Sequence, residues 1–225
     1  MEVLESTSNS GESKLGQIHL LSMPFVYVSR FDIEEGFDAE ALKWIDDVFL
    51  RQVLDSKGWN IANRYRCLSG EPRELVIYGM SKEPHDPHVG VIPLDNQLLA
   101  RRLRNYEGHV FKQVLSHGEI SNSSSLINVV STRPHPGVKA DFDSWYSNVH
   151  VPEIVACPGW LNSHRYHRLN PDDTFLAIYQ LEDAVQPFGT PEYEGAVGWG
   201  GFELQLLGYH GFRIFECVSS VVLES

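Results

Sequence analysis

The chain has 225 residues, 42% hydrophobic and 21% charged, which is the balance of a globular protein with room for one large or two ordinary domains. Its net charge of −12 argues against nucleic acid and anionic membranes as main partners, because both attract basic surfaces. It has three cysteines without metal or disulfide spacing, and no apolar run near the roughly 20 residues of a membrane helix, so we expect a cytoplasmic protein.

The first half of the chain alternates strand-like and helix-like segments. Residues 1–16 are polar and acidic, so we expect a disordered leader rather than a signal peptide. Apolar periodicity and turn residues then predict a strand, a helix, a two-stranded hairpin, a second helix and a closing strand, at 25–33, 39–54, 59–68 with 74–80, 95–105 and 106–116.

The second half repeats this order. The predicted elements are a strand, a helix, a hairpin, a second helix and a closing strand, at 125–133, 139–155, 160–169 with 174–181, 191–204 and 209–219. In the first of these helices the apolar side chains of Phe142, Trp145, Tyr146 and Val149 share one face. The glycines of 191–204 weaken the prediction of the second helix.

The two halves also align in sequence. A shift of 101 positions lays 44–80 on 145–181 without a gap, so that Trp44 meets Trp145 and Phe49 meets His150. The order βαββαβ is that of a ferredoxin-like unit, whose sheet leaves one face uncovered. We therefore predict an α+β fold of two tandem ferredoxin-like repeats, 17–120 and 121–225. They should pack sheet to sheet as an intramolecular α/β barrel with a ligand cavity between the sheets.

A specific resemblance supports this fold. The strand end TRPHPG, the helix WYSNVHVPE, the turn PGW and the following Arg-Tyr strand resemble the dimeric α/β-barrel superfamily, and within it the EthD-like proteins. The resemblance is good over 125–182 and weaker over 25–82. The residues that carry it are Trp145, Tyr146, His150, Pro152, Glu153, Pro158, Gly159, Arg165 and Tyr166. Such proteins include cofactor-free decarboxylases and cyclases, hydroxynitrile lyases, quinone-forming monooxygenases and haem-handling enzymes, so the resemblance implies the fold more than the reaction.

Two interpretations of His150 stay open. Pro152 lacks an N–H and clashes with the carbonyl of Asn148, so the helix should kink and the imidazole could bind the freed carbonyl. The resemblance instead implies a general acid or base, a role that suits a side chain that titrates near neutrality. Tyr146 lies one turn earlier and could share a hydrogen bond with His150, which makes it a second catalytic candidate.

Further residues are candidates for binding a substrate. They are Trp145, Asn128, Thr132, Arg165 and, as the counterpart of His150 in the degenerate first half, Phe49. Asn128 and Thr132 alternate with Val129 and Ser131, so either pair could line the cavity. The Arg-Tyr pair recurs in both halves, which favours a structural role for Arg165 over substrate binding.

We expect neither a metal nor a cofactor. His85 and His88 share a loop, but no third ligand is fixed by spacing. The leading hypothesis is a cofactor-independent lyase or cyclase that performs decarboxylation or aldol-type chemistry on a small aromatic or polyketide-like acid. The alternatives are a non-catalytic carrier or stress protein and a cofactor-free quinone-forming monooxygenase. The expected partner is a small hydrophobic or aromatic substrate, and the one-chain pseudo-dimer could pair further.

Overall fold

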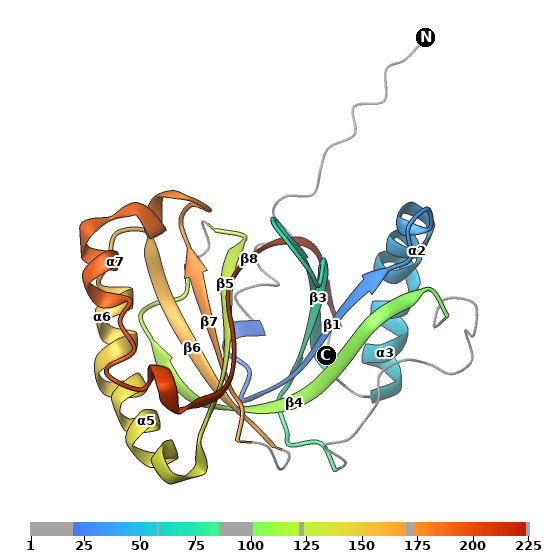
Figure 1. Ribbon diagram of the computed structural model, residues 1–225. Helices are drawn as coiled ribbons and strands as arrows, with labels where there is room; N and C mark the ends of the chain where they lie inside the picture. Colours follow the sequence, from blue (N-terminus) through green and yellow to red (C-terminus); the bar gives the residue numbers. More distant parts are fainter. Residues whose placement is uncertain (1–19, 58, 86–100, 122–123, 170–172, 224–225) are drawn as a thin grey trace.

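A computed structural model describes residues 20–57, 59–85, 101–121, 124–169 and 173–223. Their strands form one closed antiparallel barrel (Figure 1) in the order β1-β3-β2-β8-β5-β7-β6-β4, with β4 pairing with β1. The strands are β1 Phe25–Ile33, β2 Ile61–Cys67, β3 Glu74–Met80, β4 Leu103–His117, β5 Leu126–Pro134, β6 Trp160–Arg168, β7 Phe175–Leu181 and β8 Leu206–Val222.

Each half contributes four neighbouring strands in the same order. The first half runs β4-β1-β3-β2 and the second runs β8-β5-β7-β6, while the pairs β2–β8 and β4–β6 join the halves. This is a mixed α+β fold with a large antiparallel sheet and few helices, as the sequence predicts. The bounds of β1 and β3 are those predicted from the periodicity.

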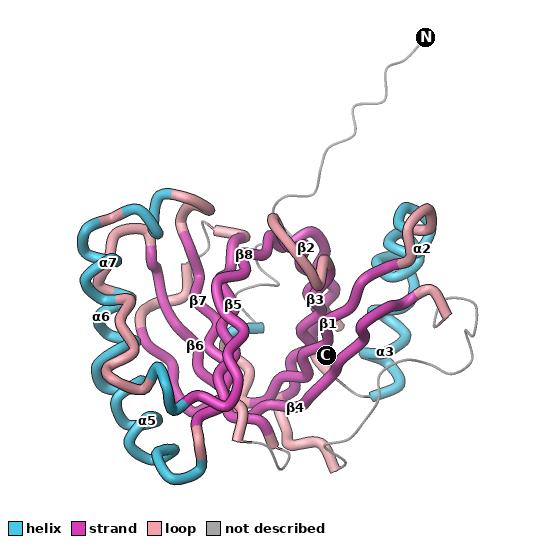
Figure 2. Tube along the Cα trace, in the orientation of Figure 1, coloured by secondary structure: helices cyan, strands magenta, loops and turns pink. Residues whose placement is uncertain are grey.

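The helices lie on the outside of the barrel, one group against each half (Figure 2). The first group is α2 Asp38–Trp44, η1 Ile45–Phe49 and α3 Leu50–Lys57. The second is η2 Pro136–Val138, α5 Lys139–Trp145, η3 Tyr146–His150, α6 Val151–Val155, η4 Gln186–Gly189, α7 Pro191–Ala196 and η5 Glu203–Gln205.

The continuous helical segments α2-η1-α3 and α5-η3-α6 contain a π-helical turn at the same place. In the first half the N–H of Leu50 donates to the carbonyl of Ile45, and in the second half the N–H of Val151 donates to that of Tyr146. A π turn inserts one extra residue, and such turns are frequent at functional sites. Since the first half has the same turn with Arg51 at the place of Pro152, the proline is not what widens the helix.

Two predicted helices differ from the structure. Of the segment 95–105, residues 95–100 lie outside the described residues, and β4 already begins at Leu103. In the segment 191–204, α7 ends at Ala196 and the short 3-10 helix η5 begins only at Glu203. The helix stops because glycines follow, and Gly200 and Gly201 have φ angles of 59° and 87° that a right-handed helix cannot use.

Side chains alternate between the inside and the outside of the barrel. Val129 and Ile178 belong to the apolar cluster inside, while Val130 and Tyr179 pack outward under the helices. Leu20 and Leu21 are fully buried in the inner cluster and fill the end of the barrel near Val26. No helix in the described ranges is both long and apolar enough to cross a membrane.

Candidate functional site

His150 lies outside the barrel, between the second group of helices and the sheet. The expectation that His150 faces a cavity between the two sheets is therefore wrong. The pocket around it is lined by Asn128, Val130, Tyr146, His150, Ile154, Trp160, Tyr179, Tyr193, Val197 and Trp199. Its free space is about 20 Å³, enough for one water molecule.

Three aromatic side chains enclose the His150 ring, which is 6% exposed. Trp145 stacks on it at a centroid distance of 4.9 Å, and Trp199 stacks at 5.9 Å. Tyr146 meets the ring edge-on at 4.8 Å. The π turn that ends at His150 presents Tyr146 and His150 to the same pocket.

The His150 ring is neutral at pH 7. Burial lowers its pKa to about 4, and the nearby Arg165 cation acts in the same direction. A hydrogen bond to the backbone of Ala196 raises the pKa, so the ring donates an N–H there. Nδ1 has no hydrogen-bond partner among the described residues. Nδ1 is therefore the ring nitrogen that is left for a substrate or a water.

This geometry also bears on the structural interpretation of His150. Ala196 belongs to α7, not to the helix that carries His150. The imidazole is thus not held by a carbonyl that its own helix releases, and that structural interpretation is wrong. Its hydrogen bond ties α7 to the helix instead.

Tyr146 is arranged as a hydrogen-bond donor. Its hydroxyl accepts a hydrogen bond of 3.1 Å from Tyr179, which leaves its own proton for another acceptor. Burial raises the pKa of Tyr146, so the phenol stays protonated. The Arg165 guanidinium carbon lies 4.6 Å from the Tyr146 ring centroid. The predicted hydrogen bond between Tyr146 and His150 is replaced by the ring contact.

Arg165 is a fully buried cation beside this pocket. Its Nη1 contacts Asp143 and donates to the Ser147 hydroxyl at 2.8 Å. Within the described residues its Nε and Nη2 have no hydrogen-bond partner. The guanidinium also lies over the Phe175 ring, 4.2 Å from the centroid.

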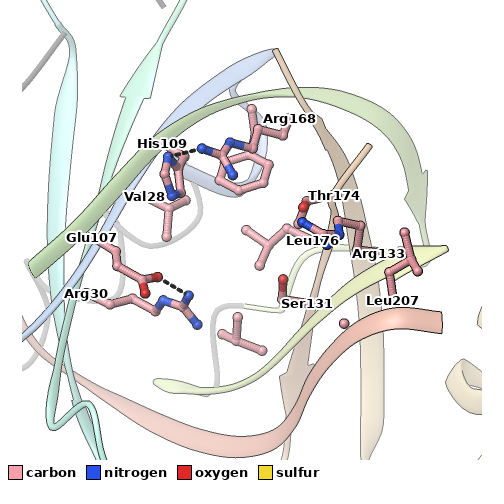
Figure 3. A pocket seen from close by; sticks show the side chains of 13 residues that line it. Val28, Arg30, Glu107, His109, Ser131, Arg133, Arg168, Thr174, Leu176 and Leu207 are labelled. Carbon is pink, nitrogen blue, oxygen red and sulfur yellow. Dashed lines mark hydrogen bonds and ion pairs between the residues drawn. The ribbon is translucent and has the colours of Figure 1, made fainter. Parts of the chain in front are cut away.

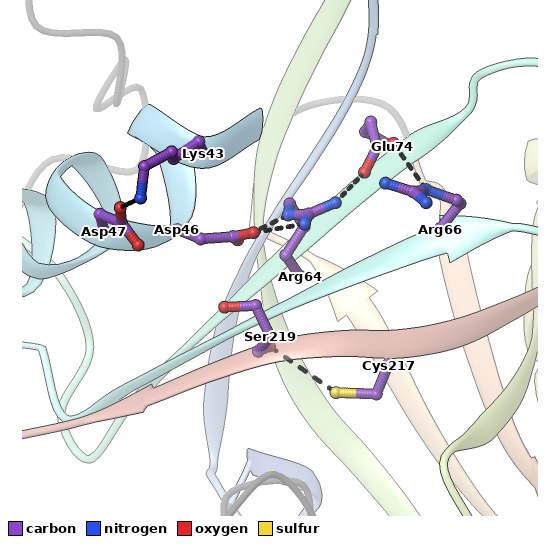
Figure 4. Close-up of polar contacts among 8 residues, drawn as sticks. All are labelled: Lys43, Asp46, Asp47, Arg64, Arg66, Glu74, Cys217 and Ser219. Atoms are coloured by element: carbon purple, nitrogen blue, oxygen red, sulfur yellow. Dashed lines mark hydrogen bonds and ion pairs between the residues drawn. The ribbon is translucent and has the colours of Figure 1, made fainter. Parts of the chain in front are cut away.

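The equivalent arginine of the first half is neutralised more completely (Figure 4). Arg64 donates to Asp46 at 2.7 and 2.5 Å and to Glu74 at 2.6 Å. Glu74 is nearly buried, with its side chain 5% exposed. The first half thus holds a closed ion-pair network under its helices.

The shift of 101 positions places Ser147 on Asp46 and Phe175 on Glu74. Both carboxylates that neutralise Arg64 are therefore missing around Arg165. The remaining carboxylate, Asp143, has a side chain that is 46% exposed. The recurrence of the arginine is structural, but its surroundings differ in the half that carries His150.

Of the other predicted binding residues, some lie at the His150 pocket and some do not. Trp145 and Asn128 lie at the His150 pocket. Thr132 is buried but does not line it. Phe49 lies in the first half and stacks on Trp44 at 5.1 Å, much as His150 stacks on its tryptophan. It cannot contribute to the same pocket, because it belongs to the apolar cluster of the other half.

Sequence reasoning missed Trp199. The segment that carries it was predicted as the weak second helix of the repeat, with no role at the site. A large aromatic residue between glycines, in a segment with little regular structure, was the available signal.

The described residues hold no group of three or more His, Cys, Asp or Glu side chains that could bind a metal. His85 is exposed, and His88 lies outside the described residues. A haem does not fit beside His150 in this arrangement, because aromatic rings contact the imidazole on three sides and the free space is that of one water.

No known family profile matches the chain, and no curated protein matches it. Several solved structures match the chain in fold. An anthrone oxidase-like protein superposes with a TM-score of 0.61 at 9% identity, covering 90% of this chain and 94% of its own. A "putative monooxygenase" from Lactobacillus acidophilus NCFM superposes with a TM-score of 0.55 at 8% identity, covering 90% of this chain and 100% of its own.

A mutant chlorite dismutase from Candidatus Nitrospira defluvii gives a TM-score of 0.56 at 11% identity, covering 90% of this chain and 95% of its own. The chain has a ferredoxin-like α/β fold. At these identities the likeness shows the fold alone, and one such fold carries unrelated chemistries.

Proposed function

We propose that the chain is a cofactor-independent enzyme that removes a proton from a small aromatic substrate in the His150 pocket, after which the substrate reacts with oxygen. The observation that carries this proposal is the neutral His150 ring, whose Nδ1 lone pair has no partner among the described residues. A buried neutral imidazole can accept a proton but has none to donate from Nδ1.

This observation favours oxidation over the decarboxylase hypothesis. A decarboxylase needs an acid that protonates the carbanion after carbon dioxide leaves, and a histidine with a pKa of about 4 is not protonated at pH 7. An oxidase or a base-catalysed cyclase needs only the base. An anthrone oxidase-like protein and a "putative monooxygenase" share the fold, which supports oxidation as the first candidate.

Tyr146 would stabilise the negative charge that the substrate acquires. When a proton leaves a carbon next to a conjugated carbonyl, the charge moves to the carbonyl oxygen. The Tyr146 hydroxyl can donate to that oxygen, and the Arg165 cation under its ring strengthens the donor. The apolar walls exclude water, which increases the weight of both interactions.

The reaction balances without an added reductant. For anthrone, the ring methylene loses one proton to Nδ1, and the resulting carbanion reacts with dioxygen to form a peroxide. Nδ1 returns its proton to the outer oxygen of the peroxide, and the O–O bond then breaks as the second methylene hydrogen leaves as a proton. One oxygen atom becomes the new carbonyl and the other leaves as water, so anthrone and dioxygen give anthraquinone and water.

A substrate of this size needs more space than the pocket now offers. The wall that can move is the segment of Trp199, which lies between α7 and η5 and contains Gly198, Gly200 and Gly201. Little regular structure holds this segment, because α7 ends at Ala196 and η5 begins only at Glu203, and Phe202 packs against Trp145 at a centroid distance of 5.4 Å. We infer that outward movement of Trp199 admits the substrate.

We also infer that the two halves arose by duplication and that the chain is related to the EthD-like proteins. The supporting observations are the common strand order, the π turn at the same place in both halves, and the matched pairs Trp44–Phe49 and Trp145–His150. The second half would then have kept the working pocket.

The test measures oxidation of anthrone at pH 6.5 under air and under argon, with the spontaneous rate subtracted. We expect wild-type protein to form anthraquinone only with oxygen, and under ¹⁸O₂ the product should gain one labelled atom. His150→Phe should lower the rate by at least about 10²-fold. The variant should fold, because a phenylalanine already occupies the matched place in the first half.

Phe49→Leu serves as the matched control and should leave the rate unchanged. Equal rates for wild type and His150→Phe would overturn the role of His150. Turnover of a β-keto aromatic acid with equal speed under argon would replace the oxidase by a lyase.

A further inference from the structure

A second cavity lies inside the barrel, among the side chains drawn in Figure 3. Its volume is about 360 Å³, within the range of small-molecule sites and far larger than the space beside His150. Side chains from β1, β4, β5, β6, β7 and β8 line it, so the rigid barrel itself holds its shape.

The polar side of this cavity is basic. Three arginines line it, namely Arg30, Arg133 and Arg168, and Glu107 is the one carboxylate among the described residues of the lining. Glu107 is held by Arg30 at 2.6 Å. In a chain with a net charge of −12, three cations that converge on one cavity run against the overall charge.

The arginines are also held in place. Arg168 on β6 donates to Nδ1 of His109 on the neighbouring strand β4 at 2.6 Å (Figure 3). The hydroxyls of Ser131 and Thr174 lie on the same lining. Planar guanidinium groups of this kind recognise carboxylates through paired hydrogen bonds.

The floor of the cavity is apolar. Val28, Phe111, Val129 and Leu176 line it and belong to the buried cluster inside the barrel. A ligand that fits both parts needs an anionic group at the arginines and an apolar body against this floor. A free inorganic anion would contact only the arginine-lined side of the cavity.

We propose that this barrel cavity is a binding site for a small organic acid with an apolar body, separate from the His150 pocket. The two sites lie on opposite faces of β5. Val129, Ser131 and Arg133 point into the barrel, while Asn128 and Val130 line the His150 pocket. The proposal does not depend on the chemistry at His150.

The test is isothermal titration calorimetry of the full chain with 2-naphthoate, and with the neutral 2-naphthalenemethanol as its uncharged counterpart. We expect the carboxylate to bind at least about tenfold more tightly than the alcohol, because charge-assisted bonds to arginine are lost in the alcohol. Arg133→Met and Arg168→Met should each weaken naphthoate about tenfold. Glu107→Gln should tighten it, since the competing carboxylate is removed.

Arg51→Met, on the exposed side of α3, is the matched charge control and should not change the affinity. Trp199→Ala, at the His150 pocket, should not change it either. Unchanged binding by both cavity variants, or equal affinity for acid and alcohol, would overturn the proposal. So would loss of binding only in Trp199→Ala. Thermal unfolding of each variant confirms that a loss of binding is not a loss of fold.

Discussion

Arg165 stacks on Tyr146, with the guanidinium carbon 4.6 Å from the centre of the phenol ring. A fully buried cation thereby lies directly behind the hydrogen-bond donor of the His150 pocket. The same cation lowers the pKa of His150. One residue therefore keeps the imidazole unprotonated, so that it can accept a proton, and strengthens the Tyr146 hydroxyl as a donor.

Replacing Arg165 by methionine should raise the pKa of His150 from about 4 towards its usual 6.5, because one of the two causes that lower it is removed. NMR titration of the imidazole protons of His150 measures this shift directly. Arg51→Met is the charge control, and His150 should titrate there as in wild type. An unchanged titration in Arg165→Met would show that the cation does not act on the imidazole.

The two equivalent arginines should differ in their contribution to stability. Arg64→Met leaves Glu74 buried without its main partner, so we expect the free energy of unfolding to fall by about 3–5 kcal/mol. Arg165→Met leaves only the half-exposed Asp143, which water can solvate, so its loss should be smaller. Urea denaturation of both variants tests the difference, and equal losses would contradict the asymmetry of the two networks.

The low pKa of His150 makes stability depend on pH. The unfolded ring binds a proton near pH 6.5, whereas the folded ring does so only near pH 4. The contribution of the neutral His150 ring to the free energy of unfolding is therefore fully present above pH 6.5 and is lost as the pH falls from 6.5 towards 4. At pH 5 the loss attributable to His150 is about 2 kcal/mol.

His150→Phe should remove this part of the pH dependence. We expect the difference in the free energy of unfolding between pH 7 and pH 5 to be smaller in the variant by about that amount. Because His164 is also buried with a pKa of about 4, some acid sensitivity should persist. An identical pH dependence in wild type and variant would place the His150 pKa near its ordinary value.

Trp199→Ala tests the movable wall of the pocket. Removing the indole enlarges the space beside His150, so the second-order rate constant for anthrone should rise if entry limits the reaction, while larger substrates should gain most. Stopped-flow kinetics with anthrone and a bulkier substituted anthrone measure both. Trp160→Phe, on the opposite side of the pocket, is the comparison variant. A uniform loss of activity in Trp199→Ala would show that the indole positions the substrate instead.

Much of the fold follows from the sequence. The alternation of FVYVSRFDI and ELVIYGM fixes β1 and β3, and the apolar stripe that includes Phe142 and Tyr146 predicts the helix that carries His150. The helix predicted over 95–105 does not extend to the end of that segment. Its leucines have helical spacing, yet its last residues pair with β1, and tertiary pairing overrides local propensity.

The site was predicted only in part. Spacing places Tyr146 and His150 on one helix face, but it cannot tell which face of the sheet that helix covers. The cavity was therefore assigned to the space between the sheets. The alternation along the strands does indicate the arginines inside the barrel. Arg30 lies on the same side of its strand as Val28, and Arg133 lies on the same side as Val129.

The most direct test of proton abstraction by His150 needs no oxygen. Anthrone deuterated at its methylene is incubated in H₂O buffer under argon, and loss of deuterium to the solvent is followed by mass spectrometry. The account predicts that wild-type protein accelerates this exchange, that Phe49→Leu does so equally, and that His150→Phe does not. Equal acceleration by wild type and His150→Phe, or oxidation under air without any accelerated exchange under argon, would contradict it.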